Sequence, residues 1–461
     1  MSVDRRVLAG SAGPERGGAE CLPGAGRSDL SAGAGGRDVE PVGLWDEFVD
    51  PRNLSVALLR VRANRGAAGV DGMTTGEIAP WLMVHWEQVR VALDEDTYRP
   101  SPVRRVVIPK PGGGERLLGV PTVLDRVIQQ ALAQVLARVF DPGFSPLSFG
   151  FRPGRSAHQA VEVSRRFIED GYRWVVDVDL EKFFDRVNHD ALMARVARKV
   201  SDRRVLRLVR RFLDAGVMVE GVRQPVVEGT PQGSPLSPLL SNIMLDDLDR
   251  ELSARGLRFV RYADDLRVFV RSKRAAQRVL DGVIKVVEGR LKLRVNREKS
   301  SVQPANAAVF LGFGFFFAAG GLVKVRVAPK AIDRLRTRLR ELTRRNWGVS
   351  MAYRIHMLNR FVRGWMAYFR IAGTPGVFMS LDKWYRRRMR QICWKQWKRP
   401  ATRRRMLASL GVPSLSATRW GASSKGPWRI AGSAVLQRAL PTSYWTNQGL
   451  LSLHTTWRRF R

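Results

Sequence analysis

Residues 259–270, FVRYADDLRVFV, contain two short apolar runs separated by an acidic turn. The runs at 259–262 and 266–270 are rich in aromatic and β-branched residues, which is typical of β-strands. We therefore predict a β-hairpin with Asp264 and Asp265 at its turn. Two adjacent carboxylates repel each other unless a cation neutralises them, although Asp pairs also favour turns for structural reasons alone.

A third carboxylate follows another strand-like run. Residues 174–180, WVVDVDL, are interpreted as a buried strand that ends near Asp179, and a charge there needs a partner. Three carboxylates suit Mg²⁺, and two such ions can clamp the attacking and leaving oxygens of a phosphoryl transfer. Asp177 lies on the same face of this strand as Asp179, and its role stays open.

The order of elements predicts where these carboxylates meet. The strand with Asp179 is followed by helical patterns near 187–200 and 273–291, with the hairpin between them. This is the course of a split β-α-β sheet, which places the hairpin beside the first strand. Asp185 is expected to cap the helix at 187–200. Asp246 and Asp247, a second acidic pair, lie among leucines and are expected on a solvated helix face.

The charge of the chain indicates a polyanionic partner. Among 461 residues, 79 are Lys or Arg and 42 are Asp or Glu, which gives a net charge of +37. Nucleic acid is the most common partner of so basic a chain. Biased codon use explains the excess of 66 Arg over 13 Lys, but it does not explain the small number of acids.

Composition also excludes several classes of protein. A hydrophobic fraction of 44% excludes disorder of the whole chain, and the apolar runs are too short to span a membrane. Two cysteines exclude a disulfide framework and a Cys-rich zinc module. The first 40 residues have nine Gly and no aromatic residue, so we expect a disordered extension over 1–43.

The composition shifts near residue 329. Nine of the 13 Trp lie at or after Trp347, and residues 382–405 hold eleven Lys or Arg with Asp382 as the single acid. Helical spacing of apolar residues predicts a mainly helical, basic region. Its tryptophans, among them Trp394 and Trp397, either stack on unpaired bases or pack in the core. One apolar stripe is formed by Ile332, Leu335, Leu339 and Leu342.

Several segments together carry a resemblance to a known family. Residues 262–265 (YADD) resemble the catalytic box of reverse transcriptases, and 179–185 (DLEKFFD) resemble their first palm motif. Residues 229–238 (GTPQGSPLSP) are similar to the Pro-Gln-Gly segment of bacterial retroelements. Further similar segments are 64–72 (NRGAAGVDG), 108–111 (IPKP), 116–121 (RLLGVP) and 358–369 (LNRFVRGWMAYF).

The resemblance covers about 44–461 and is to group II intron-encoded reverse transcriptase/maturases of the bacterial type without a C-terminal nuclease domain. It implies an α/β right-hand polymerase, with a split-βαβ-type antiparallel sheet in its fingers and palm, followed by an α-helical thumb/maturase domain. Fingers and palm are expected at 44–320, and the thumb and RNA-binding maturase (X) domain at 321–461. The last 60 residues hold one His and no Cys, so no His/Cys nuclease is expected.

The resemblance also implies site residues. Asp179, Asp264 and Asp265 would be catalytic and would hold two Mg²⁺ with the backbone carbonyl of Leu180. The other residues expected to bind the nucleotide are Lys110 and Arg116 at the triphosphate, Phe184 against a 2′-hydroxyl, Gln232 in the pocket and Lys299 near the pyrophosphate. Phe184 as a core residue and Lys299 as a surface lysine remain alternatives.

Primer and template are expected to lie further along the chain. Phe310, Gly312 and Gly314 would form a primer grip, with packing of a β-turn as the alternative, and Arg334 and Arg338 would contact nucleic acid from a thumb helix. His85, His158, His189 and His356 are isolated in the sequence and are expected to be structural or on the surface.

The implied function is that of an RNA-directed DNA polymerase that also binds its group II intron RNA and assists splicing and mobility. Its partners would be intron RNA, an RNA template, a DNA primer or target, and dNTPs, without a membrane and with the protein as a monomer or homodimer. We expect a bacterial cytoplasmic protein associated with the nucleoid or a ribonucleoprotein. The alternatives are an RNA-binding splicing cofactor with an idle polymerase site and a domesticated reverse transcriptase in defence.

Overall fold

The computed structural model describes residues 43–109, 115–219, 222–224, 229–230 and 233–460. The extension expected over 1–43 therefore lies almost entirely outside the described residues. The chain forms two compact units, which we describe separately. Unit 1 comprises the chain up to Ser145 with Leu180–Leu248 and Val287–Arg294, and unit 2 comprises Pro146–Asp179, Asp249–Val286 and Val295–Arg461.

Unit 1 is built around a buried helix, α4. Most of α4 is apolar and buried, and Thr122 caps it because its side-chain oxygen accepts a hydrogen bond from Asp125 N. Helices α1 and α2 pack on α4, and a separate sheet has the strand order β2-β1-β4-β5. The elements are α1 (Leu44–Val49), α2 (Pro51–Asn64), α3 (Ile78–Asp94), β1 (Val103–Pro109), β2 (Glu115–Val120), α4 (Val123–Phe140), η1 (Asp141–Gly143), η2 (Phe183–Asp185), α6 (His189–Val196), α7 (Arg203–Leu213), β4 (Val217–Val219) and β5 (Val222–Gln224). Helix α8 (Ser237–Ala254) runs from unit 1 into unit 2.

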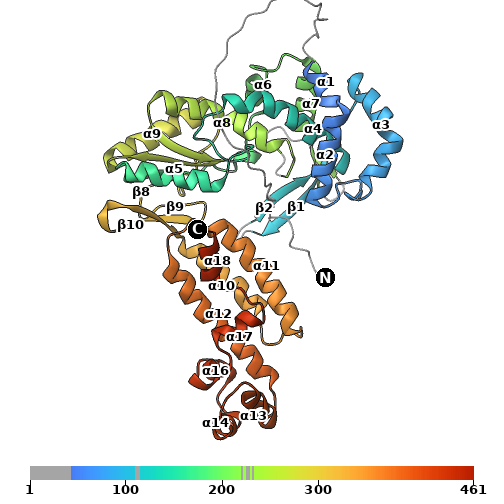
Figure 1. The fold of residues 1–461 in the computed structure, drawn as a ribbon. Coiled ribbons are helices and arrows are strands. Elements are labelled where there is room, and N and C mark those ends of the chain that lie inside the picture. Colours follow the sequence, from blue (N-terminus) through green and yellow to red (C-terminus); the bar gives the residue numbers. More distant parts are fainter. Residues whose placement is uncertain (1–42, 110–114, 220–221, 225–228, 231–232, 461) are drawn as a thin grey trace, which may run out of the picture. The chain divides into compact units, whose positions relative to one another are not determined.

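Unit 2 contains the predicted hairpin in a four-stranded sheet. The strands are β3 (Trp174–Val178), β6 (Arg258–Tyr262), β7 (Asp265–Val270) and β8 (Ser301–Pro304), in the order β6-β7-β3-β8. Every neighbouring pair is antiparallel, and β7 lies directly beside β3 as the sequence predicts. Helix α5 (Ala157–Glu169) packs on β6 and β7, and α9 (Lys273–Gly289) matches the helix expected at 273–291 (Figure 1).

A second, smaller sheet and a series of helices complete unit 2. The sheet has the order β11-β10-β9, and no strand follows it in the described residues, as the composition predicts. One core extends from Phe269 of the first sheet through Phe313 of the second to Leu335, Leu339 and Trp394 of the helices. The elements are β9 (Val309–Phe310), β10 (Phe313–Phe317), η3 (Ala319–Gly321), β11 (Val323–Val327), α10 (Pro329–Leu342), α11 (Met351–Phe369), α12 (Pro375–Gln396), α13 (Pro400–Ser409), α14 (Ser414–Gly421), α15 (Pro427–Ile430), α16 (Ala434–Ala439), α17 (Thr442–Asn447) and α18 (Leu453–Arg459) (Figure 1).

Two helix predictions are wrong. Asp185 does not cap the helix after the first motif, because it lies in η2 and the cap of the shorter α6 is Asn188, whose side chain accepts a hydrogen bond from Ala191 N at 2.8 Å. Asp247 is not simply solvated, because it pairs with Arg195 at 2.9 Å and Arg198 at 2.5 Å.

Burial settles whether Trp394 and Trp397 stack on bases or pack in the core. Trp394 and Trp397 are only 1% and 8% exposed, so they pack in the core and do not stack on bases.

Among the residues that the structure describes, no helix has the length and apolarity needed to cross a bilayer.

Candidate active site

The hairpin turn between β6 and β7 is held from one side by a buried arginine. Tyr262 pairs with Asp265 across the turn, and Ala263 takes the left-handed conformation, with φ at 58°. Arg261 donates to the carbonyl of Ala263 at 2.8 Å and forms an ion pair with Asp249 at 2.5 Å. Both charged side chains are buried, so this pair fixes the turn that carries Asp264.

A glycine that our sequence interpretation missed packs directly against the backbone of this turn. A Cβ atom on Gly150 would lie 2.1 Å from Ala263 N and 2.8 Å from the carbonyl carbon of Tyr262. Phe149 N also donates to the carbonyl of Arg261 at 2.8 Å. Only a glycine therefore fits here. Nothing in the sequence around Gly150 indicates that a turn more than a hundred residues away lies against it.

The structure brings the three predicted aspartates into one cavity. Four carboxylates and two cations line a space of about 400 Å³, namely Asp177, Asp179, Asp264, Asp265, Arg267 and Lys299. Asp179 is fixed through its backbone, because its N–H donates to Ser300 Oγ at 3.1 Å and its carbonyl accepts from Asn296 N at 2.8 Å. Lys299 Nζ lies 4.0 Å from Asp179 Oδ2.

Arg267 is the second residue that sequence reasoning missed. Its side chain is buried, and Nη1 lies 2.5 Å from a carboxylate oxygen of Asp177 and 2.5 Å from one of Asp265. Asp177 and Arg267 are direct cross-strand partners in the pairing of β3 with β7. The available signal was therefore the register, since opposite charges face each other once the hairpin is placed beside the first strand.

Burial and like charge perturb the acids of this cavity. Burial raises the pKa of Asp177 to about 6, with Arg267 opposing the change and the carboxylates of Asp265 and Asp179 adding to it. Burial also raises the pKa of Asp265, again against the effect of Arg267. These carboxylates therefore lie where an additional cation would be stabilised.

The donor set fits magnesium, although the side chains are not gathered around one point. In the described part of the chain, no three Asp, Glu, His or Cys side chains form a group that could hold a metal ion as they stand. Cations of the protein already lie beside these carboxylates, because Arg267 bridges Asp177 and Asp265 and Lys299 lies 4.0 Å from Asp179. Three carboxylates that line one cavity are nevertheless the hard oxygen donors that Mg²⁺ prefers.

The other residues predicted to bind the nucleotide are not among those that line the acidic cavity. Lys110 and Gln232 are outside the described residues, and the backbone of Arg116 lies in β2 opposite Ile108. Leu180 and Phe184 belong to unit 1, where Leu180 is buried and Phe184 is half-buried against Phe183. Their predicted roles stay predictions.

The predicted primer grip is tightly packed. Phe310 is buried, and Gly312 has φ at 81° with its Cβ position 3.4 Å from the Phe369 ring. A Cβ on Gly314 would lie 3.1 Å from Arg326 Nε. Both the role at a primer and the alternative of a β-turn stay predictions. Arg334 and Arg338 are exposed and line a cavity of about 380 Å³ with aromatic side chains of α11 such as Trp365.

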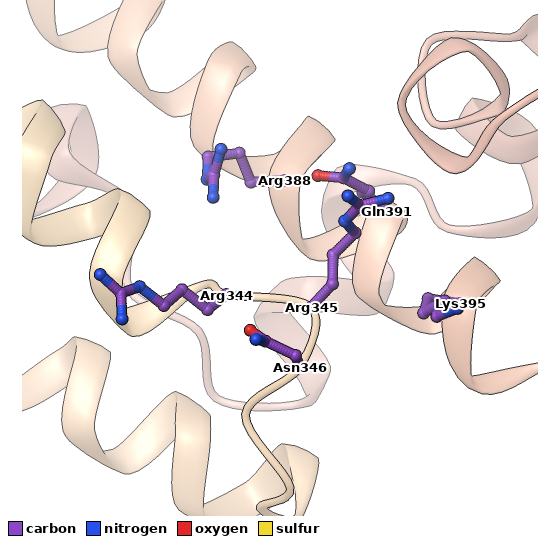
Figure 2. A pocket seen from close by; sticks show the side chains of 6 residues that line it. All are labelled: Arg344, Arg345, Asn346, Arg388, Gln391 and Lys395. Atoms are coloured by element: carbon purple, nitrogen blue, oxygen red, sulfur yellow. The ribbon is translucent and has the colours of Figure 1, made fainter.

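A second, strongly basic cavity lies among the helices of unit 2. It measures about 590 Å³ and is lined by the loop after α10 and by one side of α12, as Figure 2 shows. Its lining residues are Arg344, Arg345, Asn346, Arg388, Gln391 and Lys395. No carboxylate is among them, so the cavity is suited to anions.

The loop that carries this cavity is fixed by buried arginine. Arg354 is fully buried and donates to the carbonyls of Leu342 at 2.9 Å, Arg344 at 3.2 Å and Trp347 at 2.8 Å. Arg388 Nε donates to Thr343 Oγ1 at 2.5 Å, and burial followed by the charges of Arg340 and Arg345 lowers its pKa. The cavity is therefore preorganised and carries uncompensated positive charge.

An acidic cavity beside a hairpin turn is what a metal-dependent phosphoryl-transfer enzyme needs, and comparison with known proteins identifies the family of this chain. Residues 108–315 match "Reverse transcriptase (RNA-dependent DNA polymerase)", and residues 332–410 match "Group II intron, maturase-specific domain". The chain therefore has a reverse transcriptase fold, which the mixed helices and sheets of the structure agree with.

Several known proteins are similar to parts of this chain. Protein YkfC of Escherichia coli (strain K12) is 33% identical over 60% of this chain and 82% of its own length. The group II intron-encoded protein LtrA of Lactococcus lactis subsp. cremoris is 36% identical over 56% of this chain but 42% of its own length. An uncharacterized 91 kDa protein in the cob intron of Schizosaccharomyces pombe is 37% identical over 45% of this chain and 25% of its own.

The chain belongs to the group II intron family of reverse transcriptases with a maturase domain. The activity of that family is RNA-directed DNA synthesis, together with splicing and mobility of the intron.

Proposed function

We propose that this chain synthesises DNA on an RNA template with Asp179, Asp264 and Asp265 as its catalytic residues. The observation that carries the proposal is the convergence of these three carboxylates, from β3 and from the β6–β7 turn, on one cavity. Two Mg²⁺ held by them and by the carbonyl of Leu180 would activate the attacking hydroxyl and stabilise the leaving pyrophosphate.

The protein's own groups would prepare the site for those ions. The Arg261–Asp249 pair and Gly150 fix the position of the turn, and Ser300 fixes the backbone of Asp179. A fixed backbone limits how far these carboxylate side chains must turn to meet a metal ion. Arg267 neutralises part of the negative charge of Asp177 and Asp265 before metal arrives.

The remaining assignments follow the family resemblance. We propose fingers and palm over 44–320 and a thumb with maturase domain over 321–461. Lys110 and Arg116 would bind the triphosphate, Phe184 would exclude a 2′-hydroxyl, and Lys299 would lie near the pyrophosphate, a role that its place in the acidic cavity supports. Gln232 would line the nucleotide pocket.

The basic cavity of Figure 2 would bind the phosphates of the intron RNA. Two adjacent arginines, Arg344 and Arg345, offer forked donors that match phosphate oxygens. The match of residues 332–410 to a maturase-specific domain covers this loop and supports the same assignment. Intron RNA, a template, a primer and dNTPs would then be the partners of a bacterial protein, with the oligomeric state open between monomer and homodimer.

Primer extension tests the proposal. The wild type, Asp264→Asn and Asp281→Asn would be compared on an RNA template with dNTPs and Mg²⁺. Asp281 is an exposed acid on α9 and serves as the matched control. We expect extension by the wild type and the control and a loss of at least a hundredfold in Asp264→Asn. Equal activity of all three proteins would refute the assignment.

The second candidate function is that of a splicing cofactor with an idle polymerase site. The match to a maturase-specific domain supports this candidate. Splicing of the intron RNA by Asp264→Asn separates the two roles. If splicing continues while extension stops, both functions are present and use different sites. A wild type that binds intron RNA and never extends a primer would favour the cofactor.

A further inference from the structure

A buried histidine in unit 1 contacts two hydrogen-bond acceptors. His189 is 3% exposed, its Nε2 lies 2.7 Å from the carbonyl oxygen of Gly229, and its Nδ1 lies 3.1 Å from Asp214 Oδ1. Both partners accept hydrogen bonds, so the ring satisfies both only when each nitrogen carries a hydrogen. Asp214 is itself held by Arg210, whose Nε donates to it at 2.9 Å.

The carbonyl that His189 contacts belongs to a segment under tight constraint. Gly229 has φ at 97°, and its N–H donates to the carbonyl of Val187 at 2.8 Å. The next residue, Thr230, donates its N–H to the carbonyl of Phe184 at 2.6 Å. The Gly229–Thr230 segment is therefore bound to the backbone of Phe184 itself and of Val187, which follows η2.

Close packing makes this connection rigid. A Cβ on Gly229 would lie 2.8 Å from the carbonyl oxygen of Phe184 and 3.0 Å from Asp185 Cα. The Phe184 ring is half-buried and contacts Phe183 edge-on, with 5.1 Å between ring centroids. Movement of Gly229 would therefore be transmitted directly to the backbone of Phe184.

We propose that His189 and Asp214 are positioning residues for the choice between deoxyribose and ribose. His189 fixes Gly229, the Gly229–Thr230 segment fixes the carbonyl of Phe184, and the ring of Phe184 meets the nucleotide sugar. This inference rests on the role proposed above for Phe184. It assigns a task to a histidine whose burial the sequence does not indicate.

The chemistry of the pair distinguishes this role from simple filling of the core. A leucine would fill the volume of His189 without the desolvation cost of a polar ring, so packing alone does not call for histidine. A glutamine places an amide nitrogen near the position of Nε2 and can still donate to Gly229, but it has no second nitrogen at the position of Nδ1 to donate to Asp214. The two substitutions therefore separate volume from hydrogen bonding.

The test is the ratio of kcat/KM for a dNTP to kcat/KM for the matching rNTP on one primer and RNA template. Wild type, His189→Leu, His189→Gln, Asp214→Asn and Phe184→Ala would be measured, with His85→Leu on α3 as the control histidine. We expect Phe184→Ala to lose most of the discrimination and His189→Leu to lose roughly tenfold, mainly through a higher KM for the dNTP. His189→Gln, which keeps the bond to Gly229 but not the one to Asp214, and Asp214→Asn, which weakens only the bond to Asp214, should each lose less than His189→Leu but measurably, and His85→Leu should match the wild type.

The outcomes separate this inference from the function on which it rests. Relaxed selection in Phe184→Ala with unchanged selection in folded His189→Leu would overturn the role of His189 and leave the polymerase intact. Unchanged selection in Phe184→Ala would overturn both the role of Phe184 and this inference. If His189→Leu does not fold, Asp214→Asn decides, because it keeps the ring and replaces its carboxylate partner by a weaker amide acceptor, and a discrimination ratio equal to that of the wild type would overturn the proposal.

Discussion

At the scale of single residues, the acidic turn depends on groups that lie far away in the sequence. Asp264 and Asp265 are evident from the motif, but their position is set by Gly150 and by the Arg261–Asp249 pair. Such supporting groups were not predicted, because contacts between distant segments leave no local pattern. By contrast, the contact between Asp177 and Arg267 could have been predicted, because the predicted sheet places their strands side by side.

Gly150→Ala should abolish primer extension while the protein stays folded. The added methyl would meet the backbone of Ala263 at 2.1 Å, so the turn must move and the carboxylate of Asp264 must move with it. We expect at least a hundredfold loss of kcat. Gly364→Ala on α11, where nothing lies within 4 Å of the new methyl, should be as active as the wild type. Full activity of Gly150→Ala would mean that the turn position is unimportant.

Arg267→Leu should destabilise the metal-free protein more than the magnesium-bound protein. Without Arg267, the carboxylates of Asp177 and Asp265 lose their shared cation, which costs about 2–4 kcal/mol of unfolding free energy for a buried pair. Bound Mg²⁺ would replace that charge. Urea unfolding in EDTA and in Mg²⁺ measures the difference, with exposed Arg278→Leu on α9 as control. An equal loss in both conditions would speak against a metal site here.

At the scale of elements, local sequence predicted most of the first sheet and the long helices. The strands β3, β6 and β7 and the helix α9 follow their apolar patterns closely. The failure lies at η2, where Lys182 adopts a left-handed conformation with φ at 47° and the helix starts later than expected. A lysine does not indicate such a conformation, because nothing in its side chain favours it.

The connection between α10 and α11 makes a separate prediction. Arg354→Leu removes three hydrogen bonds to carbonyls of the loop that carries Arg344 and Arg345, so both stability and RNA affinity should fall. A loss of about 3 kcal/mol in unfolding free energy is expected. Arg363→Leu, an exposed change on the same helix, controls for general effects of charge. Thermal unfolding measures the stability, and titration with RNA measures the affinity. Unchanged RNA affinity in folded Arg354→Leu would mean that this loop does not contribute to RNA binding.

At the scale of the whole molecule, the charge predicted a nucleic-acid partner and the family confirms the class of partner. The net charge of +37 did not locate the contacts, because basic residues are spread along the chain. The cavity formed by α12 and the loop after α10 is visible only in the structure, since Arg344 and Lys395 are about fifty residues apart.

RNA binding should weaken steeply with salt, and the basic cavity should account for part of the slope. Replacing both Arg344 and Arg345 by Ala should reduce the log–log slope of affinity against salt by about 1.5, the value for two phosphate contacts. Replacing Arg274 and Arg278 on α9 gives a control with the same change of charge. Identical slopes for the two double variants would show that charge alone, and not this cavity, determines binding.

Buried Arg354, which donates to three backbone carbonyls, has a consequence for changes to the coding sequence. Other buried arginines also bind backbone carbonyls, since Arg126 donates to that of Ala67 at 2.7 Å and Arg390 to that of Ala431 at 2.9 Å. Lysine at these positions would preserve the formal charge but would lose the planar, forked donor geometry of the guanidinium. Recoding arginine codons to lysine for expression would therefore be tolerated on exposed helix faces and harmful at these buried arginines, although the formal charge of the protein would be the same.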